Sequence, residues 1–414
     1  MSQLKGNLMF GQSGGPTSVI NASAAGVFLE ALKHSDVIEK VFGAAHGIVG
    51  ILNEDFYDIN QEDPAELELL KYTPSSALGS VRYKMADPAK DETDYRRLLE
   101  VFRKYNIRYF FYNGGNDSMD TCNKISKFMQ KSGWEIRCMG VPKTIDNDLF
   151  GTDHCPGFAS AAKYLATSTM EVFLDATVYN NTQITILEVM GRNAGWLTAA
   201  TALANMKGLG PDLIYLPEIP VDLEQIRQDI AKVFEEKGKV IVAISEGVKT
   251  TDGKFLPELS GEVAVDAFGH KQMGGTGEVL ATFLKDNFDT KIRTIEFSLL
   301  QRCAAHLASS NDIDEAFEAG AMAVRKAVEG MTDHMIGFQR AEGSEYKVEY
   351  ITIPLDKVAN TERKVPREWI NEAGNQINEH FYEYALPLIQ GEPARPLEDS
   401  LPRFAKLKKV KYKA

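Results

Sequence analysis

Short apolar runs that end directly in glycine or in a polar turn recur along this chain. They include "NLMF" before "GQSGG", "YFFY" before "NGGND", "CMGV" before "PKTID", "ITILEV" before "MGR" and "VIVAI" before "SEG". Runs of this length without polar alternation are typical of parallel strands that are buried on both faces. The loops after such strands meet at one edge of the sheet, where α/β proteins bind their ligands.

Amphipathic helices are expected between these runs. The apolar residues of "DYRRLLEVFRKY" follow three-four spacing and form one stripe: Tyr95, Leu98, Leu99, Phe102 and Tyr105. A second stripe, in "MDTCNKISKFM", consists of Met119, Cys122, Ile125, Phe128 and Met129. The repeated order of strand, loop and helix predicts a doubly wound α/β architecture.

The chain has 414 residues, which is more than one hydrophobic core usually holds. We therefore expect two domains with a boundary near residue 150. A further helix in "DIDEAFEAGAMAVRKAVEG" suggests that the chain then returns to the first domain. The expected division is residues 1–150 plus about 300–360 for one domain, and residues 151–300 plus about 361–414 for the other.

Charge and composition exclude several classes of partner. The formal net charge of -12 repels nucleic acid and anionic lipid, so an anionic ligand needs a local group of positive side chains. No apolar run is long enough for a membrane span or a signal peptide. Cys122, Cys138, Cys155 and Cys303 lie far apart, as expected for buried, reduced thiols. We therefore expect a cytoplasmic protein with no nucleic-acid or membrane partner.

Two glycine loops have the character of phosphate-binding loops. Gly14 and Gly15 follow the first strand, so backbone amides and a helix N-terminus can approach an anion there; a tight strand-to-helix turn is the alternative. Gly115 stands at the equivalent place in "YNGGNDS", where Asp117 is open to interpretation as a helix cap. Arg82 of "LGSVRYK" can pair with a phosphoryl group, or simply form an exposed ion pair.

The segment "GVPKTIDNDLFGTD" places Asp146, Asp148 and Asp153 within eight residues, shortly after Lys143. A carboxylate that takes a proton from a hydroxyl beside a moving phosphoryl group needs cations nearby. Lys143 is one such cation, and "MGR" brings Arg192 from another strand end. We interpret the segment as a general base in a cationic frame; the alternative is a set of acidic turn and capping residues.

Seven motifs occur together in one order: "SGGPTSVIN", "LGSVR", "GGNDS", "PKTIDND", "EVMGR", "SEG" and "RTIEFSLLQR". In residues 7 to about 330 the chain resembles the phosphofructokinase family, and within it the pyrophosphate-dependent branch. This resemblance implies an α/β fold with two doubly wound, Rossmann-like three-layer domains. It also implies that the first domain binds the phosphoryl donor and the second binds the sugar phosphate.

The resemblance carries site residues over motif by motif. The residues that it implies for the phosphoryl donor are Gly14, Gly15, Arg82, Gly115, Asp117 and Lys143. Those implied for the sugar phosphate are Thr144, Ile145, Asp146, Met190, Gly191, Arg192, Glu246, Arg293 and Arg302. The implied catalytic group is Asp146 as general base with Lys143, Arg192, Thr144 and Asp148 around it. Arg293 or Arg302 is implied to reach in from a neighbouring subunit.

Two positions favour pyrophosphate as the donor. Relatives that use ATP commonly have glycine where Asp117 stands, and a carboxylate there fills the space of the α-phosphate with negative charge. Many also have glycine where Lys143 stands, whereas an ammonium can stabilise the phosphate that leaves pyrophosphate. Because some ATP-dependent relatives carry the lysine, Asp117 and Lys143 together indicate pyrophosphate more strongly than either residue does alone.

The chain also departs from the family pattern. Asn116 stands where most members have an aspartate assigned to Mg²⁺, and an amide oxygen is a poorer ligand for that ion. We therefore expect Mg²⁺ to be held chiefly by pyrophosphate, together with Asp146 or Asp148. Leu299 and Gln183 replace a histidine and a sugar-phosphate arginine of bacterial ATP-dependent members.

The implied reaction is reversible phosphoryl transfer from pyrophosphate to the 1-hydroxyl of fructose 6-phosphate, catalysed by a homodimer or homotetramer. Three alternatives stay open at this point. An ATP-dependent enzyme of the same family is one, and a wider sugar range that includes sedoheptulose 7-phosphate is possible for either. A noncatalytic sugar-phosphate sensor would be expected to lack Asp146, and lipid or dinucleotide kinases give no reason for "PKTIDND" and "MGR".

Overall fold

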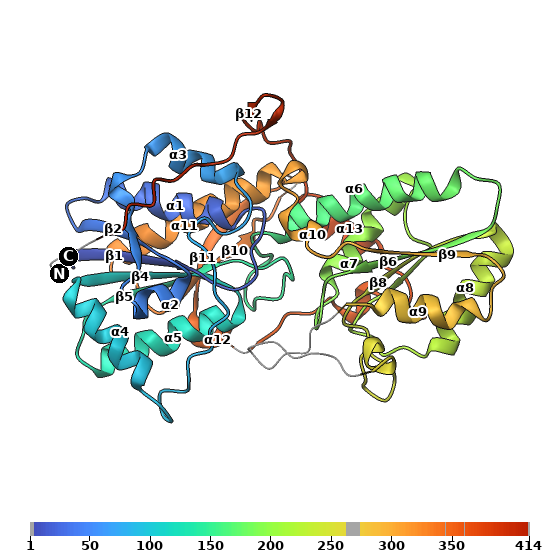
Figure 1. Cartoon of the computed structure of the whole chain (residues 1–414), viewed down its shortest axis with the longest axis horizontal. Coiled ribbons are helices and arrows are strands. Elements are labelled where there is room, and N and C mark those ends of the chain that lie inside the picture. Colours follow the sequence, from blue (N-terminus) through green and yellow to red (C-terminus); the bar gives the residue numbers. More distant parts are fainter. Residues whose placement is uncertain (1–3, 262–273, 344, 360, 413–414) are drawn as a thin grey trace. The chain divides into compact units, whose positions relative to one another are not determined.

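The computed structural model describes residues 4–261, 274–343, 345–359 and 361–412. The chain divides into two compact units (Figure 1). The first contains Met1–Gly157, Ala308–Glu362 and Gly391–Ala414, and the second contains Phe158–Leu307 and Arg363–Gln390. The last segment, from Gly391 onward, therefore belongs to the first unit, and the expected assignment of the whole C-terminal region to the second domain is wrong.

The first unit is built on a seven-stranded sheet with the order β11-β10-β5-β4-β1-β2-β3. The strands of the sheet are β1 (Gly6–Gln12), β2 (Ile38–Ala44), β3 (Phe56–Asp58), β4 (Ile107–Gly114), β5 (Arg137–Pro142), β10 (His334–Arg340) and β11 (Val348–Pro354). A separate small hairpin consists of β12 (Leu397–Glu398) and β13 (Leu401–Pro402). Its helices are α1 (Ile20–Lys33), α2 (Gly47–Leu52), α3 (Pro64–Leu69), α4 (Thr93–Lys104), α5 (Asn116–Lys131), α11 (Ser310–Val328) and α12 (Leu355–Val358). The central strands are parallel, and the edge strands β3 and β11 are antiparallel to their neighbours.

Both faces of this sheet are covered, as the continuous apolar runs predict. Leu8 and Phe10 of β1 pack into a core that includes residues of α1 and α11, whereas Met9 packs into a core on the opposite face with residues of α4 and α5. Figure 1 shows α1 and α11 on one side of the sheet and α4 and α5 on the other. The two predicted apolar stripes are confirmed, since Leu98 and Met119 lie fully buried within the second core.

Helix α11 returns to the first unit because it packs closely on α1. A Cβ at Gly26 would lie 1.9 Å from the carbonyl oxygen of Phe317, and one at Gly320 would lie 2.1 Å from that of Ser23. Only glycine allows the two backbones to approach this closely. The helix begins after Ser309, whose hydroxyl accepts a hydrogen bond from the amide of Asp312 at 3.5 Å.

The C-terminal tail runs along the first unit and is held there by backbone contacts, while its lysines are exposed. The carboxylate of Glu62 accepts hydrogen bonds from the amides of Lys408 and Lys409, each at 2.7 Å. The ring of Tyr412 packs against Phe42 with a centroid distance of 4.7 Å. The tail also forms an isolated antiparallel bridge between Tyr57 and Lys411.

The second unit contains a four-stranded parallel sheet with the order β7-β8-β6-β9. Its strands are β6 (Gln183–Val189), β7 (Leu213–Tyr215), β8 (Lys239–Ser245) and β9 (Lys291–Glu296). Its helices are α6 (Phe158–Thr177), α7 (Trp196–Ala200), α8 (Leu223–Lys237), α9 (Thr276–Lys285), α10 (Leu300–Cys303) and α13 (Glu379–Ala385). Residues of α8 and α9 pack on β6 and β8 in one core, and Figure 1 shows α6 on the opposite side of the sheet from α9.

Two further observations bear on the expectations from sequence. Cys122, Cys138 and Cys155 are buried as expected, but Cys303 is exposed, because it ends the short helix α10 at the surface of the second unit. Among the described residues, no helix combines the length and the apolar character that crossing a bilayer requires.

Candidate active site

The three loops after β1, β4 and β5 lie together at one edge of the first sheet. These strands are adjacent and parallel, so their carboxyl ends share that edge. The amide of Ser13 donates to the carbonyl oxygen of Asn113 at 2.9 Å, and the amide of Lys143 donates to that of Gly114 at 3.1 Å. The two glycine loops and the acidic loop are therefore neighbours.

Lys143 is buried beneath the first glycine loop, with only 4% of its surface exposed. Its Nζ donates a hydrogen bond to the carbonyl oxygen of Gly15 at 2.7 Å. Gly14 has a φ of 76°, and a Cβ at this position would lie 3.2 Å from the same Nζ. A buried ammonium thus supports a loop whose conformation favours glycine.

The segment that carries Arg82 is tied to the same loop. The hydroxyl of Ser80 donates to the carbonyl oxygen of Gly14 at 2.6 Å, and the amide of Gly14 donates to that of Val81 at 3.3 Å. Arg82 follows directly and is exposed. The structure therefore brings Gly14, Arg82 and Lys143 into one neighbourhood.

The second glycine loop lies against the acidic loop. A Cβ at Gly115 would lie 3.6 Å from the carbonyl oxygen of Lys143. Asn116 begins α5, and its Nδ2 donates to Asp148 Oδ2 at 3.1 Å. Asp117 lies in the first turn of α5 and is exposed. A carboxylate at a helix N-terminus is favoured by the helix dipole, so this position in the first turn suits Asp117.

The acidic loop turns sharply between its first two aspartates. Asn147 has a φ of 56°, and its Oδ1 accepts a hydrogen bond from the amide of Cys155 at 2.9 Å. The hydroxyl of Thr144 accepts one from the amide of Asp146 at 3.1 Å. Asp146 and Asp148, on either side of the turn, are both half-buried, and Ile145 is buried.

Asp153, the third carboxylate of the segment, faces another partner. Its Oδ2 lies 2.8 Å from Nδ1 of His154 and 3.0 Å from a guanidinium nitrogen of Arg340. Burial alone raises the pKa of Asp153, but these two cations outweigh burial and hold the pKa below its usual value. The structure therefore separates Asp153 from the pair formed by Asp146 and Asp148.

The electrostatics of Asp148 differ from those of an ordinary surface aspartate. Burial, followed by the charges of Asp146 and Glu362, raises the pKa of Asp148 to about 7. Hydrogen bonds to the carboxylate, including the one from Asn116, act in the opposite direction. A cation beside Asp148 would reverse this shift, because positive charge favours the ionised carboxylate.

This corner of the loop can also contribute oxygen ligands to a cation. Oδ1 of Asn116 is buried and has no hydrogen-bond partner in the described part of the chain, and Asp148 lies beside the same amide group. Neutral and charged oxygens are the ligands that Mg²⁺ accepts, so these two residues fit such an ion. Within the described part of the chain, no group of three or more histidine, cysteine, aspartate and glutamate side chains is arranged to hold a metal.

In the second unit, the loop after β6 is fixed by neighbouring side chains. Gly191 has a φ of 143°; its amide donates to Glu246 Oε1 at 3.3 Å, and its carbonyl oxygen accepts from the hydroxyl of Ser245 at 2.6 Å. The amide of Met190 donates to Gln301 Oε1 at 3.1 Å. Nε of Arg192 is buried and has no hydrogen-bond partner among the described residues. Met190, Gly191, Arg192 and Glu246 are therefore together.

The two remaining arginines lie differently. Arg302 is half-buried in α10, directly after Gln301, and so lies near this loop. Arg293 is exposed on the edge strand β9 and pairs with Thr185, five residues before Met190. At 3.3 Å per residue, this is about 16 Å along the strand, so the structure does not bring Arg293 to the loop of its own chain.

A comparison with protein families shows which family this chain belongs to. The family described as "Phosphofructokinase" matches residues 7–325, which is more than half of the chain. The chain belongs to the phosphofructokinase family. The family resemblance noted in the sequence is thereby confirmed.

Similar proteins extend the match over nearly the whole chain. A pyrophosphate–fructose 6-phosphate 1-phosphotransferase of Halomonas elongata is 44% identical over 406 residues, which cover 97% of this chain and 96% of that protein. A protein of the same name from Xanthomonas campestris pv. campestris is 43% identical and covers 98% of this chain and 97% of its own. A solved pyrophosphate-dependent phosphofructokinase from Nitrosospira multiformis has a TM-score of 0.90 at 40% identity and covers 99% of this chain and 98% of that one. The predicted phosphofructokinase fold is confirmed.

Sequence reasoning missed several residues of this phosphofructokinase that hold its loops in place. Ser80 and Gln301 lie inside motifs in which only the arginines are predicted to bind a substrate, namely Arg82, Arg293 and Arg302. Asn147 has a φ of 56°, and the enrichment of asparagine among residues with positive φ is a usable signal for a turn between the two aspartates. Glu362 had no signal in the sequence, because 214 positions separate it from Asp148.

Proposed function

We propose that this phosphofructokinase transfers a phosphoryl group from pyrophosphate to the 1-hydroxyl of fructose 6-phosphate, giving fructose 1,6-bisphosphate and phosphate. Relatives that are 43% and 44% identical carry this activity in their names. The structural observation that carries the proposal is the buried ammonium of Lys143, 2.7 Å from the carbonyl oxygen of Gly15. A fixed cation at this loop can neutralise the phosphate that leaves pyrophosphate.

The donor is proposed to lie on the loops of the first unit. Backbone amides around Gly14, Gly15 and Gly115 would bind its oxygens, and the exposed guanidinium of Arg82 would pair with one phosphoryl group. The carboxylate of Asp117 would repel the α-phosphate of a nucleotide. Pyrophosphate lacks the group that this carboxylate excludes, which supports it as the donor.

Asp146 is proposed as the general base. It would take the proton of the 1-hydroxyl while the hydroxyl oxygen attacks the terminal phosphorus and the bond to the leaving phosphate breaks. Thr144 would keep the base in place through the hydrogen bond from the amide of Asp146 to its hydroxyl, at 3.1 Å. Lys143 and Arg192 would spread the negative charge of the moving group.

The cation that we propose for this reaction is Mg²⁺. When bound, it supplies positive charge that neutralises the oxygens of pyrophosphate. Asn116 Oδ1 and the carboxylate of Asp148 would hold it, directly or through water. Asp148 would then be fully ionised at neutral pH, whereas without a cation its pKa of about 7 leaves it only partly ionised.

The sugar phosphate is proposed to bind at the loops of the second unit. Glu246 would accept hydrogen bonds from sugar hydroxyls, the loop at Met190 and Gly191 would contact the ring, and Arg302 would hold the 6-phosphate. Because Arg293 lies about 16 Å along its strand from the level of the Met190 loop, it would serve a neighbouring subunit in a homodimer or homotetramer. The substrates are metabolites of the cytoplasm, where we propose that the enzyme acts.

A donor assay with the purified protein tests the proposal. We expect turnover with pyrophosphate and Mg²⁺ to exceed turnover with ATP by at least about 100-fold, since a misplaced carboxylate excludes a ligand by several kcal/mol. Asp146→Asn should abolish turnover, whereas Asp120→Asn, which changes a partly buried aspartate on α5 that pairs with Lys124, should not. Higher turnover with ATP than with pyrophosphate would show that ATP is the donor. An active Asp146→Asn variant would show that Asp146 is not the general base.

A further inference from the structure

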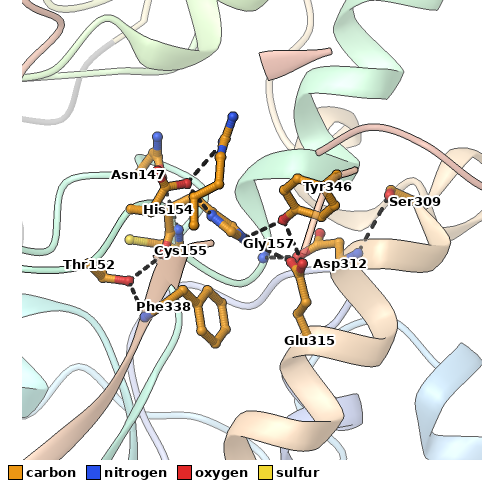
Figure 2. A network of polar contacts seen from close by, with 12 residues as sticks. Asn147, Thr152, His154, Cys155, Gly157, Ser309, Asp312, Glu315, Phe338 and Tyr346 are labelled. Atoms are coloured by element: carbon orange, nitrogen blue, oxygen red, sulfur yellow. Dashed lines mark hydrogen bonds and ion pairs between the residues drawn. The ribbon is translucent and has the colours of Figure 1, made fainter. Parts of the chain in front are cut away.

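A fully buried histidine, His154, follows the acidic loop and takes no part in the proposed chemistry. Its Nδ1 lies 2.8 Å from Asp153 Oδ2, and its Nε2 lies 2.8 Å from Glu315 Oε2. The hydroxyl of Tyr346 donates to Glu315 Oε1 at 2.6 Å and is 3.4 Å from Nε2 of His154. Figure 2 shows the imidazole among these side chains. The arrangement bridges two carboxylates with one ring.

These contacts join residues 152–155 to two other elements of the first unit, α11 and β10. Glu315 belongs to α11, and Arg340, at the end of β10, pairs with Asp153 at 3.0 Å. The segment also runs beside β10, because the hydroxyl of Thr152 accepts a hydrogen bond from the amide of Phe338 at 2.8 Å (Figure 2). The position of His154 is therefore set by the sheet and by α11 together.

The residue after His154 reaches the turn that carries the proposed base. The amide of Cys155 donates to Asn147 Oδ1 at 2.9 Å, as Figure 2 shows. Asn147 is left-handed, with a φ of 56°, and it stands between Asp146 and Asp148. Asparagine adopts this conformation more readily than other residues with a Cβ, and the contact with Cys155 fixes the side chain of Asn147 at the turn. A shift of residues 154–155 would be passed on to Asp146.

We propose that His154 is a positioning residue for phosphoryl transfer. As an imidazolium between Asp153 and Glu315, it fixes the segment that holds Asn147 and thereby sets the place of the Asp146 carboxylate. The inference rests on the proposed function only in the role given to Asp146.

Charged and titratable groups from four segments face the imidazole: Asp153 from its own segment, Glu315 from α11, Arg340 from β10 and Tyr346 from the residues before β11. Burial lowers the pKa of His154, but the charge of Glu315 and the hydrogen bonds to both carboxylates outweigh burial and raise the pKa to about 9. His154 is therefore charged at neutral pH. Its stabilising contribution is complete below the unfolded pKa of about 6.5 and is lost as the pH rises through about 9.

The first test replaces the charge and keeps a polar side chain, in His154→Gln. We expect kcat to fall at least about 100-fold, because misplacing a reacting group by about 1 Å has an effect of this order. The KM for pyrophosphate should stay within about threefold, since an interaction needed only in the transition state is lost. Amide hydrogen exchange of residues 144–157 should rise at least about tenfold at a temperature where both proteins are folded.

His34→Gln is the matched control. His34 also contacts a glutamate, with 3.3 Å between its Nε2 and Glu30 Oε1, but it lies at the end of α1. The control variant should keep the kcat and the loop exchange of the unaltered protein.

A second variant, Glu315→Gln, tests whether the protonated state of His154 is needed. It also gives a result if His154→Gln does not fold. Removing this charge should move the alkaline limb of kcat to lower pH by at least about one unit, a change that a purely structural role would not produce. The inference is overturned if His154→Gln keeps its kcat or its slow loop exchange, or if the alkaline limb of Glu315→Gln stays in place. Hydrogen exchange needs no substrate, so it separates failure of this inference from failure of the proposed reaction.

Discussion

Replacing Asp148 by asparagine should make the protein more stable at neutral pH and less active. The folded protein holds the pKa of Asp148 at about 7, against 3.8 for an ordinary aspartate, through burial and the charges of Asp146 and Glu362. The folded state therefore binds the proton more tightly than the unfolded state. Stability falls as the pH rises from 3.8 to about 7, because the carboxylate must then ionise in an unfavourable place.

The magnitude follows from the shift. A difference of about three pKa units corresponds to about 4 kcal/mol at 1.36 kcal/mol per unit. Because the side chain is only half-buried, solvent screening reduces this to about 2 kcal/mol. Asp148→Asn avoids ionisation and can still accept the hydrogen bond from Asn116, so the thermal midpoint should rise by a few degrees at pH 8. The difference should shrink as the pH falls toward 3.8 and vanish below it, where Asp148 is protonated in both folded and unfolded chains.

The assay is thermal unfolding across this pH range in metal-free buffer, together with kcat in Mg²⁺. Asp153→Asn is the matched control, because the pKa of Asp153 is lowered and this aspartate stabilises the fold; its loss should reduce stability at pH 8. We expect the activity of Asp148→Asn to fall at least about tenfold, since a ligand of the cation is lost. A variant that is less stable than the unaltered protein at pH 8 would refute the reasoning.

Three further outcomes are expected. Lys143→Met, similar in volume, should lower kcat with pyrophosphate by at least about 100-fold, the effect of losing one fixed electrostatic contact; an unchanged kcat would contradict its role. Gly14→Ala should raise the KM for pyrophosphate about fivefold, because a left-handed residue with a Cβ is strained by about 1 kcal/mol and would shift the loop; steady-state kinetics measure this. Ending the chain after Phe404 should lower the free energy of unfolding, measured in urea, by at least about 3 kcal/mol, since Glu62 and Glu66 lose backbone donors. If the shortened and full-length proteins unfold at the same urea concentration, the tail does not stabilise the fold.

Much of the fold could be predicted because burial in strands and helices leaves a local pattern. Leu8, Met9 and Phe10 form a continuous apolar run, and such a run is stable only where both faces of a sheet are covered. The stripe that includes Leu98 required a helix with one buried side. The glycine loops were also predictable, because strand ends of a parallel sheet meet at one edge.

The sequence by itself thus determined the sheet architecture and which loops share an edge, since both follow from the period and the ends of apolar runs. Only the tertiary structure decided the protonation of Asp148 and His154, the turn at Asn147 and the path of the tail. Each depends on which distant groups exclude water or bring charge. Desolvation and Coulomb forces act through space between residues far apart in the chain, and no local periodicity records them.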